Sequence, residues 1–267
     1  MTGSPTLELS AADDMATLRS VAELFGSVWG RTPEGLPVSS EILKSMVHAG
    51  GLVSVARSGD ELVGAAVLGR DDPGAGYGYI AAVRPGLVDH GVGFALKQHQ
   101  RSWSLQHGIT VLRWTFDPLV ARNARFNLTK LGAVARDYQR SFYGHMSDLL
   151  NGDDESDRLV PEWRLDSPRA VACAAGRAPD PGEPPIGSPE LVEAADGPDR
   201  LPAYAALPEV RWVRAPADIV ALRRSDPAQA SAWRGLVRER LGQALCEGYA
   251  AVGVSCTGWY RLDKELP

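Results

Sequence analysis

Apolar residues recur every three or four positions in several segments of the chain, which is the spacing of one face of an amphipathic helix. The longest such segment is 11–29, with apolar positions at Met15, Leu18, Ala22, Phe25 and Trp29. A second is 92–107, before Gly108, in which one face carries Ala95, Leu96, His99 and Trp103. Shorter helices are expected at 41–49 and 121–131.

Short apolar runs between these segments predict β-strands. The expected strands are 6–9, 52–56, 62–68, 79–83, 109–116 and 159–165. Strands 52–56 and 62–68 flank the polar turn 58–61, which predicts a β-hairpin. Because helices and strands alternate through the middle of this part of the chain, the sequence predicts a mixed α/β fold.

Prolines are concentrated in one region. Nine of the 19 prolines lie between Pro168 and Pro208, and proline can neither continue a helix nor donate to a sheet. We therefore expect an α/β domain at 1–167, a Pro-rich linker at 168–208 and a small C-terminal α/β extension at 209–267. The extension is expected to pack on the first domain or on a partner subunit. Its expected elements are helices at 217–224 and 230–247 and strands at 250–254 and 258–262.

Composition and charge narrow the classes of function. Hydrophobic residues make up 44% of the chain and charged residues 23%, which is typical of a globular protein. The net charge is −5 and neither half has a basic excess, so a nucleic-acid partner is not expected. We expect no membrane span and no secretory signal, hence a cytoplasmic protein. The three scattered cysteines predict neither a disulfide framework nor a metal site.

The junction between strand 79–83 and helix 92–107 is the clearest candidate for a binding site. Its turn runs Arg84-Pro-Gly-Leu-Val-Asp-His90, and two glycines, Gly91 and Gly93, open the helix. Glycines at a helix N-terminus let backbone N–H groups approach an anion, which the helix dipole also attracts. The turn therefore predicts a phosphate or pyrophosphate site, with a tight turn that binds no ligand as the alternative.

The order of elements and this turn together resemble the GNAT superfamily of acyl-CoA-dependent N-acyltransferases. GNAT enzymes carry an Arg/Gln-x-x-Gly-x-Gly/Ala turn after their fourth strand, and its amides hold the pyrophosphate of coenzyme A. The resemblance assigns cofactor binding to Val88, Asp89, His90, Gly91, Val92 and Gly93. Two positions depart from the family pattern. Val88 replaces the usual Arg or Gln, and Asp89 places a carboxylate beside the expected pyrophosphate.

Further segments resemble one GNAT subgroup, some of whose members are encoded beside racemases that act on N-acylated amino acids. These segments are 96–101, 114–119, 122–127, 131–132, 143–144 and 156–158. The resemblance implies an enzyme that moves an acetyl or succinyl group from acetyl-CoA or another acyl-CoA to an amine. The expected acceptor is a small molecule such as an amino acid, and the expected mechanism is direct attack without an acyl-enzyme.

The resemblance also implies catalytic groups. An amide of the fourth strand, from Val83 or Ala82, is expected to meet the acyl carbonyl, with plain sheet pairing as the alternative. The general-acid tyrosine of many GNAT enzymes corresponds to Leu128 here. Tyr143 is our candidate substitute, and the alternative for it is packing at the surface.

Polar residues after strand 109–116 complete the candidate site. Asp117 is a candidate proton acceptor, or a turn-capping residue before a proline. Asn123 is a candidate contact to the pantetheine of the cofactor, or a helix cap. Trp114, Arg122 and Arg158 are candidates for substrate binding, since guanidinium groups bind carboxylates in a bidentate manner. Core packing of Trp114 is one alternative, and an ion pair of Arg158 within the acidic loop 153–155 is the other.

Two other functions fit the same residues. One is a catalytically inactive GNAT-like module that binds CoA or serves a structural role, since Val88, Asp89 and Leu128 all depart from the catalytic pattern. The other is a protein acyltransferase with an open groove for a peptide amine. A homodimer is also left open.

Overall fold

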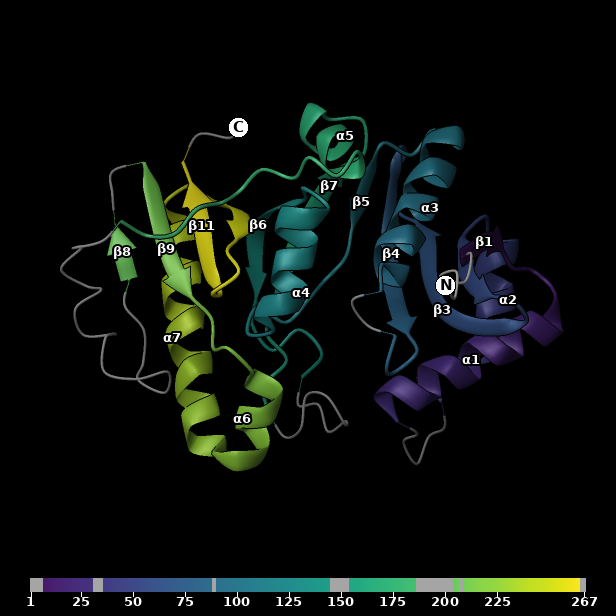
Figure 1. The fold of residues 1–267 in the computed structure, drawn as a ribbon, viewed down its shortest axis with the longest axis horizontal. Helices are drawn as coiled ribbons and strands as arrows, with labels where there is room; N and C mark the ends of the chain where they lie inside the picture. Colours follow the sequence, from purple (N-terminus) through teal and green to yellow (C-terminus); the bar gives the residue numbers. More distant parts are fainter. Residues whose placement is uncertain are drawn as a thin grey trace, which may run out of the picture. The chain divides into compact units, whose positions relative to one another are not determined.

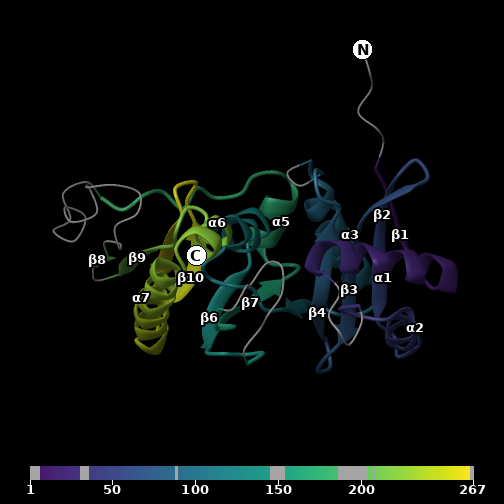
Figure 2. The same ribbon diagram turned by 90° about the horizontal axis from the view of Figure 1, so that it is seen from below.

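The computed structural model describes residues 7–30, 36–87, 90–144, 154–185, 204–206 and 209–264 (Figure 1, Figure 2). The chain divides into two compact units, Met1–Trp114 and Thr115–Pro267, which we call the N-terminal and C-terminal units. Both units combine helices with a sheet, so the expected mixed α/β fold is confirmed. No helix in the described ranges is long and apolar enough to cross a membrane.

The N-terminal unit has a five-stranded sheet in the order β1-β2-β3-β4-β5. Neighbouring strands are antiparallel from β1 to β4, and β5 pairs with β4 in parallel. Its elements are β1 Leu7–Ala11, α1 Met15–Trp29, α2 Ser40–His48, β2 Leu52–Ser58, β3 Glu61–Arg70, β4 Ala75–Val83, α3 Val92–Gln106 and β5 Val111–Arg113.

Neighbouring residues of β3 pack into different layers. Ala65 belongs to a buried cluster with Phe25 of α1 and Leu43 of α2. The next residue, Ala66, belongs to a second cluster with Val92 of α3. Successive side chains of a strand point to opposite faces of the sheet. Helices α1 and α2 therefore cover one face of this sheet, and α3 covers the other.

The start of α3 lies very close to β3. A Cβ atom added to Gly64 of β3 would lie 2.8 Å from Cγ1 of Val92 and 3.0 Å from Cδ1 of Leu96. Only a residue without a side chain allows this approach. Gly64 therefore fixes the position of the first turn of α3 over the sheet.

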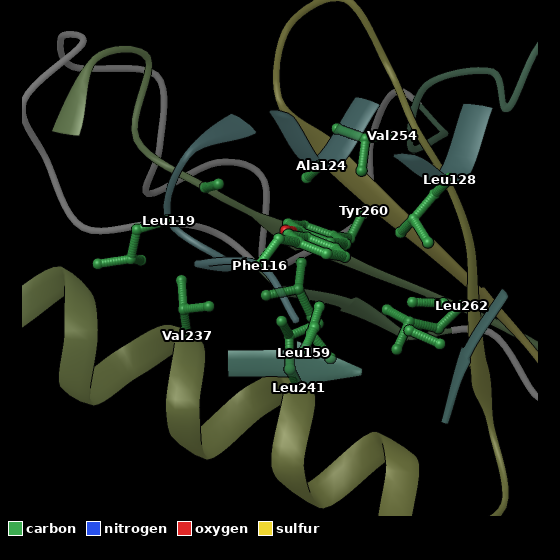
Figure 3. Packing of buried hydrophobic residues seen from close by; sticks show 14 of the residues in the cluster. Phe116, Leu119, Ala124, Leu128, Leu159, Val237, Leu241, Val254, Tyr260 and Leu262 are labelled. Carbon is green, nitrogen blue, oxygen red and sulfur yellow. The ribbon is translucent and has the colours of Figure 1, made fainter. Parts of the chain in front are cut away.

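The C-terminal unit has an antiparallel sheet in the order β7-β6-β10-β11-β9-β8. Its elements are α4 Ala121–Arg125, the π-helix η1 Phe126–Lys130, β6 Val134–Gln139, β7 Arg158–Arg164, α5 Pro168–Ala174, β8 Tyr204–Ala206, β9 Val210–Arg214, α6 Ile219–Ser225, α7 Pro227–Cys246, β10 Ala250–Val254 and β11 Trp259–Asp263. Figure 3 shows the core of this unit, in which Phe116, Leu159, Leu241 and Tyr260 come together from different elements.

The boundary of the predicted linker at 168 is wrong. Pro168 is the first residue of α5, and the Ser167 side chain caps this helix by accepting the N–H of Ala170 at 3.2 Å. Proline is tolerated there because the first N–H groups of a helix have no intrahelical partner. Strand β8 also lies within the predicted linker, and residues 186–203 lie outside the described ranges.

The compact division falls after Trp114 and not after residue 167. One buried cluster contains Phe116 and Leu159 from before the Pro-rich region and Val237 and Leu262 from after it. Burial of apolar surface in a common core joins these segments into one unit. Strand β9, which supplies the buried Val213, is absent from the predicted elements.

Candidate functional site

The turn between β4 and α3 is anchored to the neighbouring strand. The N–H of Arg84 donates to the carbonyl of Val63 at 2.9 Å, and the N–H of Leu87 donates to the carbonyl of Arg84 at 3.1 Å. The candidate residues Val88 and Asp89 lie outside the described residues. His90, the next described residue, is exposed.

Gly91 caps α3 in a left-handed conformation, with φ of 82°. Among the described residues no side chain caps this helix, and its first turn contains no acidic residue. A Cβ atom added to Gly91 would meet no described atom within 4 Å. The first N–H groups of a helix lack intrahelical acceptors. Together with the positive end of the helix dipole, those of Val92 and Gly93 form a site suited to an anion.

Strands β4 and β5 pair over three positions only, Ala75–Tyr77 against Val111–Arg113. On its other side β4 stays paired with β3 up to its last residue, with Ala82 opposite Ala65 and Val83 opposite Gly64. A β-bulge lies between Gly78 and Ile80, and bulges bend a strand and increase its twist. The later residues of β4 therefore lie beyond the end of the β5 ladder.

Asp117 of the C-terminal unit is buried and fully engaged. Its Oδ1 accepts from Nη1 of Arg234 at 2.8 Å and from the N–H of Leu119 at 2.9 Å, and its Oδ2 accepts from Nη2 of Arg223 at 2.6 Å. Burial raises the pKa of Asp117, but Arg234 and Arg223 outweigh this effect and hold the pKa below its ordinary value of 3.8. The turn-capping alternative for Asp117 is thus observed, and the geometry disfavours its role as proton acceptor.

The same arginines hold the acidic loop. Nη2 of Arg234 donates to Oδ2 of Asp154 at 2.8 Å, and Nε of Arg223 donates to the same oxygen at 3.0 Å. Asp157 is completely buried and accepts from Nε of Arg238 at 2.7 Å and from the N–H of Ser141 at 3.0 Å. We call these residues the arginine–aspartate network. It joins the acidic loop to α6 and α7.

Tyr143 lies at the surface with 51% of its area exposed. Its hydroxyl is 3.2 Å from Oγ1 of Thr115, and its N–H donates to Oγ of Ser156 at 2.9 Å. The guanidinium of Arg158 lies over its ring, 5.2 Å from the centroid. The structure therefore brings the candidates Tyr143 and Arg158 together, and places Leu128 in the core with no exposed surface.

The remaining candidates are at the start of α4 and after β5. Arg122 and Asn123 are exposed, and Asn123 accepts a hydrogen bond from Asn127 at 3.3 Å. Trp114 is buried at the end of the N-terminal unit. The described residues contain no cluster of three or more His, Cys, Asp or Glu side chains that could hold a metal ion.

Residues 2–117 match the family model described as an acetyltransferase (GNAT) domain. This part of the chain is therefore similar to GNAT acetyltransferases. No curated protein matches the sequence.

Solved structures share the fold of about three fifths of this chain. A GNAT-family protein from Desulfovibrio desulfuricans is 20% identical, with 60% of this chain and 99% of that chain covered and a TM-score of 0.50. The ribosomal-protein-S18-alanine N-acetyltransferase of Escherichia coli is 15% identical, with 61% and 96% covered and a TM-score of 0.50. An N-acetyltransferase from Staphylococcus aureus Mu50 is 12% identical, with 60% and 99% covered and the same TM-score. At these identities the likeness concerns the fold alone.

The sequence-predicted residues are divided between the two units. Val83, His90, Gly91, Val92, Gly93 and Trp114 lie in the N-terminal unit, and Asp117, Arg122, Asn123, Tyr143 and Arg158 lie in the C-terminal unit. Within the N-terminal unit, Val83 and residues 90–93 gather where β4 ends and α3 begins, whereas Trp114 follows β5.

The sequence analysis did not identify Lys97 of α3, a buried residue of the N-terminal unit. The expected apolar face of this helix included His99 and Trp103, but its buried residues are Val92, Leu96, Lys97, Gln100 and Ser104. The signal that could have found it is spacing, since Lys97 follows Gly93 by four positions and precedes Gln100 by three.

Proposed function

We propose that the protein transfers an acyl group from an acyl-CoA thioester to an amine. The observation that supports this proposal most is the uncapped start of α3 directly after β4. There Val92 and Gly93 offer backbone N–H groups beside the open surface at Gly91. A pyrophosphate fits these groups because it needs amide donors, positive potential and free space.

The chemistry assigns simple tasks to the chain. The neutral amine nitrogen of the acceptor attacks the carbonyl carbon of the thioester, and the C–N bond forms. The nitrogen then loses one proton to solvent, the C–S bond breaks, and the thiolate takes up a proton. The backbone N–H of Val83 or Ala82 in β4 is the proposed donor to the carbonyl oxygen, whose negative charge grows during attack. Tyr143 is the proposed proton donor to the thiolate, since its exposed hydroxyl lies beside Thr115.

The proton of the acceptor ammonium goes to solvent in this proposal. Asp117 is not assigned this role, because its carboxylate already accepts from Arg234, Arg223 and Leu119. We propose instead that Asp117 has a structural role in the C-terminal unit.

The proposed acceptor is a small molecule that carries an amine, with an amino acid as the first choice. Exposed Arg122 is the proposed contact for a carboxylate of that molecule. The E. coli neighbour is named for a protein substrate, the alanine of ribosomal protein S18. Peptide N-termini are therefore the second class of acceptor to test.

A second candidate function is a module that binds CoA without turnover. It is supported by Leu128, which is buried at the position expected for a general-acid tyrosine, and by the fully paired Asp117.

Thermal unfolding in the presence of CoA, acetyl-CoA and succinyl-CoA tests the proposal. A ligand that binds only the native state stabilises it by about 2.7 kcal/mol at a concentration one hundred times its Kd. We expect the unfolding temperature to rise with each CoA compound and to reveal the preferred acyl group. Release of free thiol is then followed with free amino acids and with short peptides. Stabilisation without release would favour the binding module, and no stabilisation at millimolar ligand would contradict both functions.

A further inference from the structure

Helix α3 buries a lysine that has no polar partner. Lys97 is 8% exposed, and its Nζ lies over the ring of Trp114, 4.0 Å from the centroid. Within the described part of the chain it forms no ion pair and no hydrogen bond. An unpaired ammonium is costly to bury. Perturbed charged groups of this kind gather at functional sites.

Burial lowers the pKa of Lys97 from an ordinary 10.5 to about 8, and no charged neighbour contributes. The charged or titratable groups on its own helix and on the neighbouring β4 and β5 are His99, Arg101, Tyr77, Tyr79 and Arg113. The other strands packed against α3 carry Glu8 on β1, Arg57 on β2, and Glu61 and Arg70 on β3. A sizeable fraction of the Lys97 amine is therefore neutral near pH 8, and a neutral amine is a nucleophile. The other three lysines, Lys44, Lys130 and Lys264, are all exposed.

The amine lies beside the backbone of β4 at the point where β5 leaves it. Gly78 directly follows the last residue of β4 that pairs with β5. A Cβ atom added to Gly78 would lie 3.6 Å from Nζ of Lys97 and 3.5 Å from Cβ of Trp114. Because residue 78 is a glycine, no side chain at this position covers the Lys97 amine. Backbone groups at the end of a ladder can receive an extended ligand.

We propose that Lys97 is itself an acyl-acceptor site, whose amine is acylated by a thioester lying along β4 beyond Tyr77. The proposal rests on the proposed function for the acyl-CoA donor. Nζ attacks the thioester carbonyl carbon, a C–N bond forms, the C–S bond breaks, and one proton of the amine passes to the departing thiolate. No oxidant or further reactant is needed.

The product suits its surroundings better than the amine does. An amide carries no charge, so acylation removes the ammonium whose burial is unfavourable. The acyl chain extends from the amine toward the space beside Gly78. The modified protein is therefore expected to unfold at a higher temperature than the unmodified one.

Peptide mass spectrometry of the full chain tests this site. The protein is incubated with acetyl-CoA and, separately, with a short acetyl thioester that lacks the nucleotide, between pH 7 and pH 9. Acetylation is measured at all four lysines, with the denatured chain as the reference. At pH 8 we expect Lys97 to be acetylated about tenfold faster than the exposed lysines, because much more of its amine is neutral. This preference should be absent from the denatured chain.

The variant Gly78→Val provides a second test in which Lys97 itself is unchanged. The added side chain covers the amine, so acetylation of Lys97 should slow while that of Lys44, Lys130 and Lys264 stays unchanged. The proposal would be overturned if, with both donors, Lys97 of the wild type were acetylated no faster than the exposed lysines, even if CoA binds. Preferential labelling by the short thioester alone, without stabilisation by CoA, would support this site and contradict the proposed function.

Discussion

The two units differ in whether their buried charged side chains have ion-pair partners. In the C-terminal unit, Asp117 and Arg234 are both buried, and every charge in the arginine–aspartate network meets its opposite within 3.1 Å. In the N-terminal unit, Lys97 is buried against Trp114 and forms no ion pair with any described residue. A paired buried charge contributes to structure. An unpaired one costs stability, which points to a chemical role.

This difference favours Lys97 over Asp117 as the residue with a chemical role. Asp117 follows a strand at a place where ligands commonly gather, yet two guanidinium groups occupy its oxygens. Lys97 is marked in the sequence only by its spacing on a helix of mixed composition, yet its amine is the group left unpaired. A residue type therefore indicates less about function than the partners that the fold supplies.

Breaking the paired region should have the largest effect. Arg234→Met leaves the buried Asp117 and the partly buried Asp154 with Arg223 as their remaining partner in this network. Removing one partner of a buried pair costs about 3–5 kcal/mol. We expect the free energy of unfolding, measured by denaturant titration, to fall by this amount.

Arg224→Met on α6 is the matched control, because Arg224 is exposed. Its effect should stay within about 0.5 kcal/mol of the wild type. Equal effects of the two substitutions would contradict the structural role of the network.

Removing the unpaired charge should have the opposite sign. Lys97 has a pKa of about 8 in the folded chain against an ordinary 10.5. The cost of burying the ammonium is therefore present in full below pH 8 and disappears as the pH rises to 10.5. Lys97→Met should raise the free energy of unfolding at pH 7 by up to about 3 kcal/mol, and by progressively less at pH 9 and pH 10.

Lys44→Met provides the control in the same unit, since Lys44 is exposed. It should change stability little and without a dependence on pH in this range. A Lys97→Met variant that is less stable than the wild type at pH 7 would show that the amine is well solvated or paired.

Acid should weaken the ion pairs of Asp117. The pKa of Asp117 is held below 3.8, so its contribution to stability is present above that pH and is lost as the pH falls through the folded-state value. The difference in unfolding free energy between the wild type and Asp117→Asn should therefore shrink below pH 4. Lys97 is protonated in both states there and contributes no pH dependence. A constant difference down to pH 2 would contradict the ion pairing of Asp117.

The smallest effects on stability are expected at the two ends of α3. Gly91 and Gly108 both have positive φ, 82° and 72°, and both have open space where a Cβ atom would lie. Replacing either by alanine should cost about 1 kcal/mol, because L-residues are strained in this conformation. Equal losses measured by thermal unfolding would make the two variants a matched pair for binding studies.

Periodicity and short apolar runs predicted most helices and strands of the N-terminal unit, because α1 and α2 bury an apolar face and β2 and β3 are buried along most of their length. The segment after Ser167 was misassigned because proline content says nothing of position, and Pro168 occupies the one turn of a helix where its missing N–H is harmless. The strand at 210–214 was missed because its short apolar run is interrupted by two arginines.

The candidate site was predictable only where local sequence determines it. Gly91 and Gly93 mark the start of α3 from the sequence alone. The partners of Asp117 lie more than one hundred residues further along the chain, and no local pattern indicates such a pairing. The burial of Lys97 likewise depends on Trp114, which follows another strand.

The central claim is that the start of α3 binds an acyl-CoA. Calorimetric titration of acetyl-CoA into the wild type, Gly91→Ala and Gly108→Ala tests it most directly. The account predicts that Gly91→Ala binds about tenfold more weakly, equivalent to roughly 1.4 kcal/mol, because the added methyl group stands where the phosphate oxygens approach. Gly108→Ala should keep the wild-type Kd. Equal affinities for all three proteins, or no binding by any of them, would contradict the account.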